Sequence, residues 1–174
     1  MKMAAEREIA AEPHIVWAAL LDPGVLKECV PGCQEMNGNA DDGFEAVVVQ
    51  KVGPVKATFK GAVTISDRVE GESLTLSGEG KGGAAGFAKG GADVRLEPSE
   101  AGTRLIYDVE AKVGGKLAQL GSRIIDGFAK KMADQFFTRF QEAVEEPADE
   151  NDAVSDTDAK EDAPKKGWFK KLVG

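Results

Sequence analysis

Residues 115–144 constrain the fold most, because their apolar side chains recur at steps of three and four. This spacing places them on one side of an α-helix, and alanines widen that side to about half of the circumference. At about 1.5 Å per residue the predicted helix is about 45 Å long, too long for a small domain to cover at one contact. We therefore expect a curved sheet to wrap around it. The repeated apolar positions are Leu117, Gly121, Ile124, Ile125, Phe128, Met132, Phe136 and Phe140.

Between residues 47 and 113 the apolar period changes to two, which is typical of strands with one wet face. The alternation is longest over residues 55–66 and recurs in shorter runs up to Val113. Turns that contain glycine separate the runs, so consecutive strands should pair as an antiparallel meander of five or six strands.

The first thirty residues predict one strand and two short helices. Residues 2–12 are a weak strand candidate. Pro13 occupies an early-turn position of the first helix, and Asp22-Pro23-Gly24 ends that helix and starts a second one, which runs through Cys29. The predicted class is α+β, with a strand, two short helices, the meander and the long helix in that order.

Charge divides the chain near Val144. The full chain has 174 residues and a net charge of -8, of which residues 1–144 carry -4. Residues 145–163 hold nine acids and one lysine, and the last ten residues hold four lysines. We expect one domain over residues 1–145, an acidic disordered linker over 146–164 and a basic-aromatic tip over 165–174.

The tip interleaves bulky apolar and basic residues, a composition that favours contact with an anionic bilayer surface. Docking onto a partner protein and a merely solvated end are the alternatives. The predicted membrane contacts are Lys165, Lys166, Trp168, Phe169, Lys170, Lys171 and Leu172.

Several classes of protein are disfavoured. A domain of net charge -4 has no electrostatic case for binding nucleic acid. No apolar run approaches the roughly 20 residues of a membrane span, and the N-terminus lacks the apolar core of a signal peptide. Two cysteines are too few for a disulfide framework. A cytoplasmic protein with reduced thiols is expected.

The chemical motifs are weak. The glycine-rich stretch at 78–83 matches GxGxxG, but another strand follows it, so no helix N-terminus is available for a pyrophosphate. Cys29, Cys33 and His14 are too few for a structural zinc site. His14 is also the only histidine, and no base stands beside a nucleophile. We expect no catalytic residue, no metal and no tightly bound cofactor.

The inner face of the sheet predicts a hollow. Its residues include many Ala, Gly and Val, whereas the helix opposite is long, so the volume is poorly filled. The alternative is that the helix phenylalanines fill it. The predicted cavity residues are Phe59, Val63, Leu76, Val94, Tyr107, Val109, Leu117, Gly121, Ile124 and Phe128.

Several short motifs stand in order over about residues 1–144. They are Val16-Trp17 with Asp22-Pro23, Cys29-Val30-Pro31-Gly32-Cys33, Val52-Gly53-Pro54-Val55, Gly102-Thr103-Arg104-Leu105-Ile106-Tyr107, Gly114-Gly115-Lys116-Leu117-Ala118, Gln119-Leu120-Gly121-Ser122-Arg123 and Phe136-Phe137. Together these motifs resemble the CoxG family, the G-subunit family of carbon monoxide dehydrogenase. The proline-glycine-cysteine and glycine-glycine-lysine elements are the more specific ones.

The resemblance implies a helix-grip fold of the START and pollen-allergen type, in which about seven antiparallel strands grip the C-terminal helix around an apolar cavity. It implies an accessory role, in which the protein brings a molybdenum-containing carbon monoxide dehydrogenase, or a related molybdenum hydroxylase, to the inner face of the cytoplasmic membrane. The family pattern supplies no catalytic residues.

Three functions remain open from the sequence. A binding module would hold an apolar molecule, with a membrane quinone or a lipid as the candidate. An enzyme of the polyketide-cyclase or hydrolase type would need polar groups inside the cavity, where only Tyr107 is available. A pure protein adaptor would have a filled core.

Overall fold

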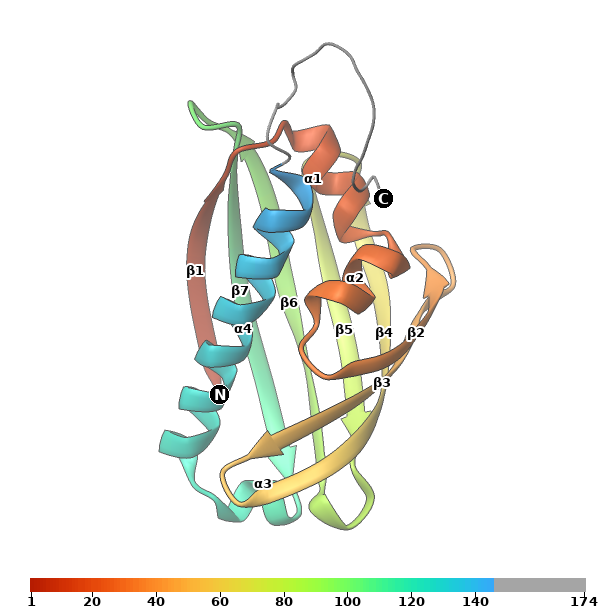
Figure 1. Ribbon diagram of the computed structural model, residues 1–174, viewed down its shortest axis with the longest axis vertical. Coiled ribbons are helices and arrows are strands. Elements are labelled where there is room, and N and C mark those ends of the chain that lie inside the picture. Colours follow the sequence, from red (N-terminus) through yellow and green to blue (C-terminus); the bar gives the residue numbers. More distant parts are fainter. Residues whose placement is uncertain (146–174) are drawn as a thin grey trace, which may run out of the picture. The chain divides into compact units, whose positions relative to one another are not determined.

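Alternating residues build one strongly curved sheet, and the helices lie over its concave face (Figure 1). The computed structural model describes residues 1–145. The seven strands are all antiparallel, in the order β1-β7-β6-β5-β4-β3-β2. Their bounds are β1 Lys2–Ile9, β2 Cys33–Asn39, β3 Gly43–Val52, β4 Val55–Val69, β5 Ser73–Lys81, β6 Phe87–Pro98 and β7 Thr103–Gly114.

The predicted fold class is confirmed. Strands β2 to β7 form a meander, and β1 closes the sheet by pairing with β7. The edge strand β2 is the one that the alternation did not reveal. The helices are α1 Pro13–Leu20, α2 Pro23–Cys29, α3 Lys116–Gln119 and α4 Ser122–Val144, and a short 3₁₀ turn, η1 Gly83–Ala85, connects β5 to β6.

The prediction of one unbroken helix over residues 115–144 is wrong. The chain leaves α3 at Leu120 and starts α4 at Ser122, because Gly121 between them has a φ of +89°. That backbone conformation ends a right-handed helix, and glycine adopts it without the clash that a Cβ causes. Helix α4 alone has 23 residues and is about 35 Å long.

The turn between α2 and β2 is fixed by a close backbone approach. Before that turn, Asp22 caps the start of α2, because its Oδ1 accepts hydrogen bonds from the N–H groups of Gly24 at 2.8 Å and Val25 at 3.3 Å.

After α2 the chain turns at Gly32, whose φ is +78°. A Cβ there would lie only 2.1 Å from the carbonyl oxygen of Val49, so only glycine lets the turn lie against β3.

The buried side chains form two clusters at opposite ends of the sheet. The larger cluster joins α1, α2, β1 and the C-terminal half of α4, and its most deeply buried members are Ile9, Val16, Leu105 and Phe140. The smaller one contains Val52, Leu117 and Ile125. The middle of α4 therefore crosses the sheet between two packed regions.

Candidate ligand-binding cavity

A cavity of about 700 Å³ lies between the concave face of the sheet and α4. Strands β3 to β7 supply its floor through their inward residues, and α4 supplies the opposite wall through seven residues that share one side of the helix. The α4 residues are Ile125, Phe128, Ala129, Met132, Ala133, Phe136 and Phe137. The core between sheet and helix is therefore hollow rather than filled.

Small residues leave this space empty. Near its end β5 has Gly78 and Gly80 on the inward face, which pair with Gly90 and Ala88 of β6, and Gly90 in turn pairs with Ala111 of β7. A Cβ placed at Gly80 would meet no atom within 4 Å. The predicted shortage of side-chain volume on the inner face is confirmed.

Eight of the ten predicted cavity residues line this space: Phe59, Val63, Leu76, Val94, Tyr107, Val109, Leu117 and Phe128. The other two predictions, Gly121 and Ile124, are wrong. Gly121 lies in the break between α3 and α4, and Ile124 is 39 % exposed. Ile124 packs outside the cavity instead, near the β3–β4 turn, where a Cβ at Gly53 would lie 3.4 Å from its Cγ2.

The sequence-based prediction missed the contributions of β1, β2 and the start of β3. All four methionines of the chain, Met1, Met3, Met36 and Met132, line the cavity. Methionine is flexible and polarisable, so it adapts to apolar guests of irregular shape. No periodic signal marks Met36, because β2 is an edge strand with both faces largely exposed.

Gln50 is the main polar side chain inside the cavity. It lies on the inward face of β3, and its Nε2 donates a hydrogen bond to the carbonyl oxygen of Pro31 in the α2–β2 turn. The same nitrogen lies 3.8 Å from Sδ of Met132 on α4. An amide nitrogen carries two hydrogens, and its carbonyl oxygen accepts, so Gln50 can hold the turn and still offer hydrogen bonds to a guest.

Where β1 passes α4, a layered group of side chains borders the cavity. The guanidinium carbon of Arg7 lies 5.1 Å from the ring centroid of Phe137, and that ring stacks on Tyr107 with centroids 5.2 Å apart. Arg7 Nη2 also donates to Oδ1 of Asp134 at 2.5 Å. This group fixes the Tyr107 ring.

The ion pair perturbs both partners. Burial acts to lower the pKa of Arg7, but its hydrogen bonds to Asp134 and Tyr107 outweigh burial, so that the pKa is raised. The hydrogen bond from Arg7, with help from Lys130, lowers the pKa of the Asp134 carboxyl. Both groups are therefore held in their charged forms.

The two cysteines do not form a reactive centre. Burial raises the pKa of the Cys29 thiol to about 12, and burial also raises the pKa of Cys33. Within residues 1–145 no three His, Cys, Asp or Glu side chains lie close enough together to hold a metal ion.

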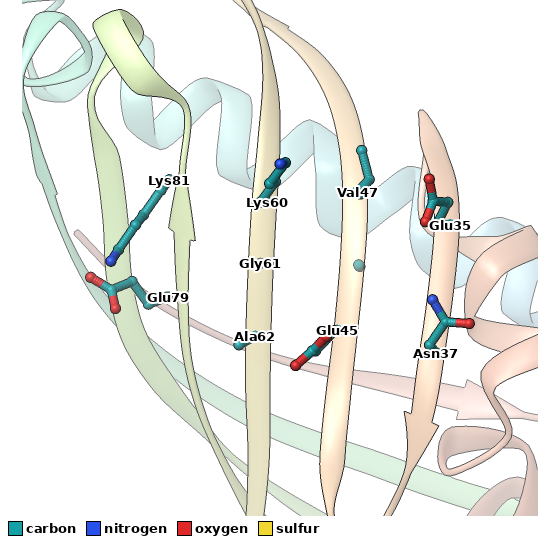
Figure 2. A pocket seen from close by; sticks show the side chains of 10 residues that line it. Glu35, Asn37, Glu45, Val47, Lys60, Gly61, Ala62, Glu79 and Lys81 are labelled. Atoms are coloured by element: carbon teal, nitrogen blue, oxygen red, sulfur yellow. The ribbon is translucent and has the colours of Figure 1, made fainter.

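A second, smaller hollow of about 340 Å³ lies on the opposite, convex face of the sheet (Figure 2). Its floor is Val47 and Ala62, and charged side chains of both signs surround it, among them Glu45, Lys60 and Glu79. Most of its residues lie on outward strand positions, whereas Ala46 and Gly61, which also line the apolar cavity, lie on inward ones. It is a shallow depression between exposed side chains, on the other side of the sheet from the apolar cavity.

None of the helices within residues 1–145 combines the length and the apolar character needed to cross a membrane. The predicted linker over residues 146–164 and the predicted membrane contacts from Lys165 to Leu172 lie outside the described residues.

Solved structures share this fold. A conserved protein from Geobacillus kaustophilus is 27 % identical, with a TM-score of 0.78 over 83 % of this chain and 95 % of that chain. A START superfamily protein from Mycobacterium smegmatis is 13 % identical, with a TM-score of 0.62 over 83 % of this chain and 97 % of that chain. A protein from Thermus thermophilus is 15 % identical, with a TM-score of 0.61 over the same shares.

Among curated proteins, none matches the chain significantly. The profile of the CoxG family, described as the G-subunit of carbon monoxide dehydrogenase, matches residues 6–145. These residues contain all four helices and the whole sheet except the start of β1. The match agrees with the motifs and with the START-like fold, and the chain therefore belongs to the CoxG family of carbon monoxide dehydrogenase.

Proposed function

We propose that this protein is a non-catalytic accessory protein that binds an apolar molecule in its cavity. In this proposal it serves a molybdenum-containing carbon monoxide dehydrogenase, or a related molybdenum hydroxylase. The cavity of about 700 Å³ carries the proposal. Small-molecule sites usually measure about 300–1,000 Å³. A charged guest would lose its hydration in this apolar space without finding partners, so an apolar molecule is favoured.

A membrane quinone is the candidate guest, with a lipid as the alternative. A dehydrogenase needs an electron acceptor, and an acceptor that dissolves in the bilayer combines a small polar ring with an apolar tail. The second N–H of the Gln50 amide faces Sδ of Met132, a weak acceptor, and a ring carbonyl in the cavity can replace that sulfur as the acceptor. The four methionines can adapt to the tail.

The site gives no support to the enzymatic alternative. Among the described lining residues, Tyr107 is the one titratable side chain on an inward strand position, and it is engaged by Arg7 and Phe137. A catalytic nucleophile needs a base or another activating group within hydrogen-bond reach, and no second titratable side chain on an inward strand position of residues 1–145 lines the cavity. Because the Tyr107 phenol is already held by Arg7 and Phe137, the cavity favours binding of a guest over catalysis.

The proposal places the protein in the cytoplasm, peripherally on the inner face of the cytoplasmic membrane, where it recruits the dehydrogenase. The C-terminal tip supports this part through its four lysines together with Trp168 and Phe169. Each lysine near an anionic surface contributes about 1 kcal/mol, so the attraction is weak enough to be reversible.

Quinone transfer tests the binding function. Phosphatidylcholine vesicles that contain ubiquinone are incubated with the protein and then sedimented, and the quinone in the supernatant is measured by absorbance. We expect soluble quinone in proportion to the protein. Supernatant quinone equal to that of a protein-free sample would overturn the quinone assignment.

Recruitment is tested separately. The purified dehydrogenase should sediment with phosphatidylglycerol-containing vesicles only when this protein is added. Replacing Trp168→Ala and Phe169→Ala should reduce that sedimentation. A dehydrogenase that sediments equally without this protein contradicts the recruiting role.

A further inference from the structure

Three connections meet at the end of the domain that carries α3 (Figure 1). They are the β3–β4 turn, the η1 connection between β5 and β6, and the chain from β7 through α3 into α4. A Cβ at Gly53 in the first would lie 3.4 Å from Cγ2 of Ile124, and a Cβ at Gly115 would lie 2.6 Å from Cα of Gly86. Their segments, which are 51–60, 80–89 and 112–123, therefore form one surface.

Every charged residue in these three segments is basic. They hold eight lysines and arginines and no acidic residue. All eight are exposed, and none of them forms an ion pair with another residue of the described part of the chain. We call this surface the basic end. Its charged residues are Lys51, Lys56, Lys60, Lys81, Lys89, Lys112, Lys116 and Arg123, of which Lys60 and Lys81 lie at its border and also line the convex hollow with Glu79.

The opposite end of the sheet carries the opposite charge. Its connecting segments hold nine acidic residues and a single arginine, Arg68, which is paired with Asp41. Since residues 1–144 carry a net charge of -4, the basic end does not follow from a basic composition. The separation of charge along the domain orients it at an anionic surface. The acidic segments are 10–24, 39–43, 67–73 and 97–103.

Large apolar side chains are exposed among the cations of the basic end. Phe87 is 42 % exposed, and Ile124, which directly follows the third segment and lies beside Gly53 of the first, is 39 % exposed. The two comparable residues, Ile15 and Val69, lie in or beside the acidic segments, where no group of lysines accompanies them. Lysines around exposed apolar residues fit a bilayer interface, which offers anionic headgroups above apolar chains.

The basic end also forms one end wall of the cavity. Phe59, Val113 and Leu117 belong to two of its three segments and line the apolar space from inside. An apolar guest that leaves a membrane at this end would enter the cavity past these residues. A surface that binds only an acidic protein would not need to lie against the cavity.

We propose that the basic end docks on the anionic surface of a lipid bilayer and turns this end of the cavity toward the membrane. The inference rests on the membrane association proposed above. It assigns that association to a surface of the folded domain, in addition to the C-terminal tip.

Binding of the full chain to vesicles tests the assignment. The variant Lys51→Gln, Lys56→Gln, Lys116→Gln is compared with the variant Lys27→Gln, Lys131→Gln, Arg139→Gln, which loses the same charge from exposed positions elsewhere that likewise form no ion pair within residues 1–145. On phosphatidylglycerol–phosphatidylcholine vesicles we expect the first variant to partition about fivefold less for each lysine removed, about a hundredfold in all. The second variant should bind nearly like the parent.

A reporter pair tests the orientation. Phe87→Trp and Ile15→Trp introduce tryptophan at positions of equal exposure, 42 %, at opposite ends of the domain. Both are made with Trp168→Phe, so that the tip does not contribute emission, and the buried Trp17 contributes the same background emission to both. Lipids with brominated acyl chains should quench the tryptophan emission of the Phe87→Trp variant and leave that of the Ile15→Trp variant unchanged.

The outcomes separate the two proposals. If the parent does not bind anionic vesicles, membrane association fails and the inference fails with it. Three other results would overturn only the assignment to the basic end. One is that the parent binds and both charge variants lose the same amount of vesicle binding. Another is that lipid quenches the Ile15→Trp reporter instead of Phe87→Trp. The third is that the parent binds and the variant Lys51→Gln, Lys56→Gln, Lys116→Gln binds vesicles like the parent.

Discussion

The guanidinium of Arg7 on β1 donates to Oδ1 of Asp134 on α4 at 2.5 Å, and this ion pair joins two elements 127 residues apart. It ties the first strand to the helix that covers the cavity. Asp134 also lies 3.4 Å from Nζ of Lys130, one turn earlier on α4. The side chains that border the cavity between sheet and helix are thus held by charge as well as by stacking.

We expect Asp134→Asn to lower the melting temperature at neutral pH, because Arg7 loses its charged partner. The hydrogen bond from Arg7 holds the pKa of Asp134 below its ordinary value of 3.8, so the folded state is stabilised by the ionised carboxylate above that pH. The contribution disappears as the pH falls through the lowered pKa. Thermal melts of parent and variant should therefore converge in acid.

Asp126→Asn is the matched control, since Asp126 is exposed on the same helix and forms no ion pair with any residue of 1–145. It should leave the melting temperature nearly unchanged at both pH values. A gap between Asp134→Asn and parent that persists unchanged in acid would contradict the role given to the ion pair.

Gln50→Leu should destabilise the domain, because the carbonyl oxygen of the buried Pro31 loses its donor. Leaving a buried acceptor unpaired costs about 1–3 kcal/mol. Gln34→Leu provides the comparison: its amide donates to Gly32 at 3.1 Å in an exposed position, where water can replace it. Urea unfolding measures both, and equal losses would show that Gln50 does not hold the turn.

The two halves of α4 should respond differently to truncation. Phe140 is fully buried in the larger cluster, so Phe140→Ala should cost about 3–5 kcal/mol of unfolding free energy. Phe128 is only half-buried and faces the cavity, so Phe128→Ala should cost on the order of 1–2 kcal/mol. Chemical denaturation distinguishes them, and a larger loss at Phe128 would contradict the position of the cavity.

Strands could be predicted wherever one face is exposed to solvent and the other is buried. Residues 55–66 alternate because β4 lies inside the sheet with its inner face toward the cavity. Strand β2 gave no such signal, because an edge strand has few inward positions to fill. The family motifs supplied the strand number that alternation left open.

The apolar periodicity could not predict which side chains of α4 face the cavity. Ile124 and Ile125 are neighbours with the same side-chain chemistry, yet Ile125 is 8 % exposed against the cavity and Ile124 is 39 % exposed. The break at Gly121 resets the helix and decides which of the two turns inward. A periodic pattern treats glycine as a small apolar residue and does not reveal its φ of +89°.

Gln50 was missed for a different reason. One polar residue in an apolar strand is ordinarily assigned to the outer face, and only the distant Pro31 explains its inward position. Contacts between residues far apart in the chain leave no periodic trace in the sequence.

The amount of apolar molecule that co-purifies with each chain shows whether the cavity between sheet and helix holds a guest. The parent and the variant Gly80→Leu are purified under mild, detergent-free conditions and extracted with organic solvent, and the extract is quantified by mass spectrometry. A leucine at Gly80 projects into the cavity, where a Cβ meets nothing within 4 Å, whereas Ala62→Leu adds similar bulk on the convex face. We predict a quinone or lipid with the parent and with Ala62→Leu, and little or none with Gly80→Leu. Equal amounts from all three proteins, or none from the parent, would contradict the account.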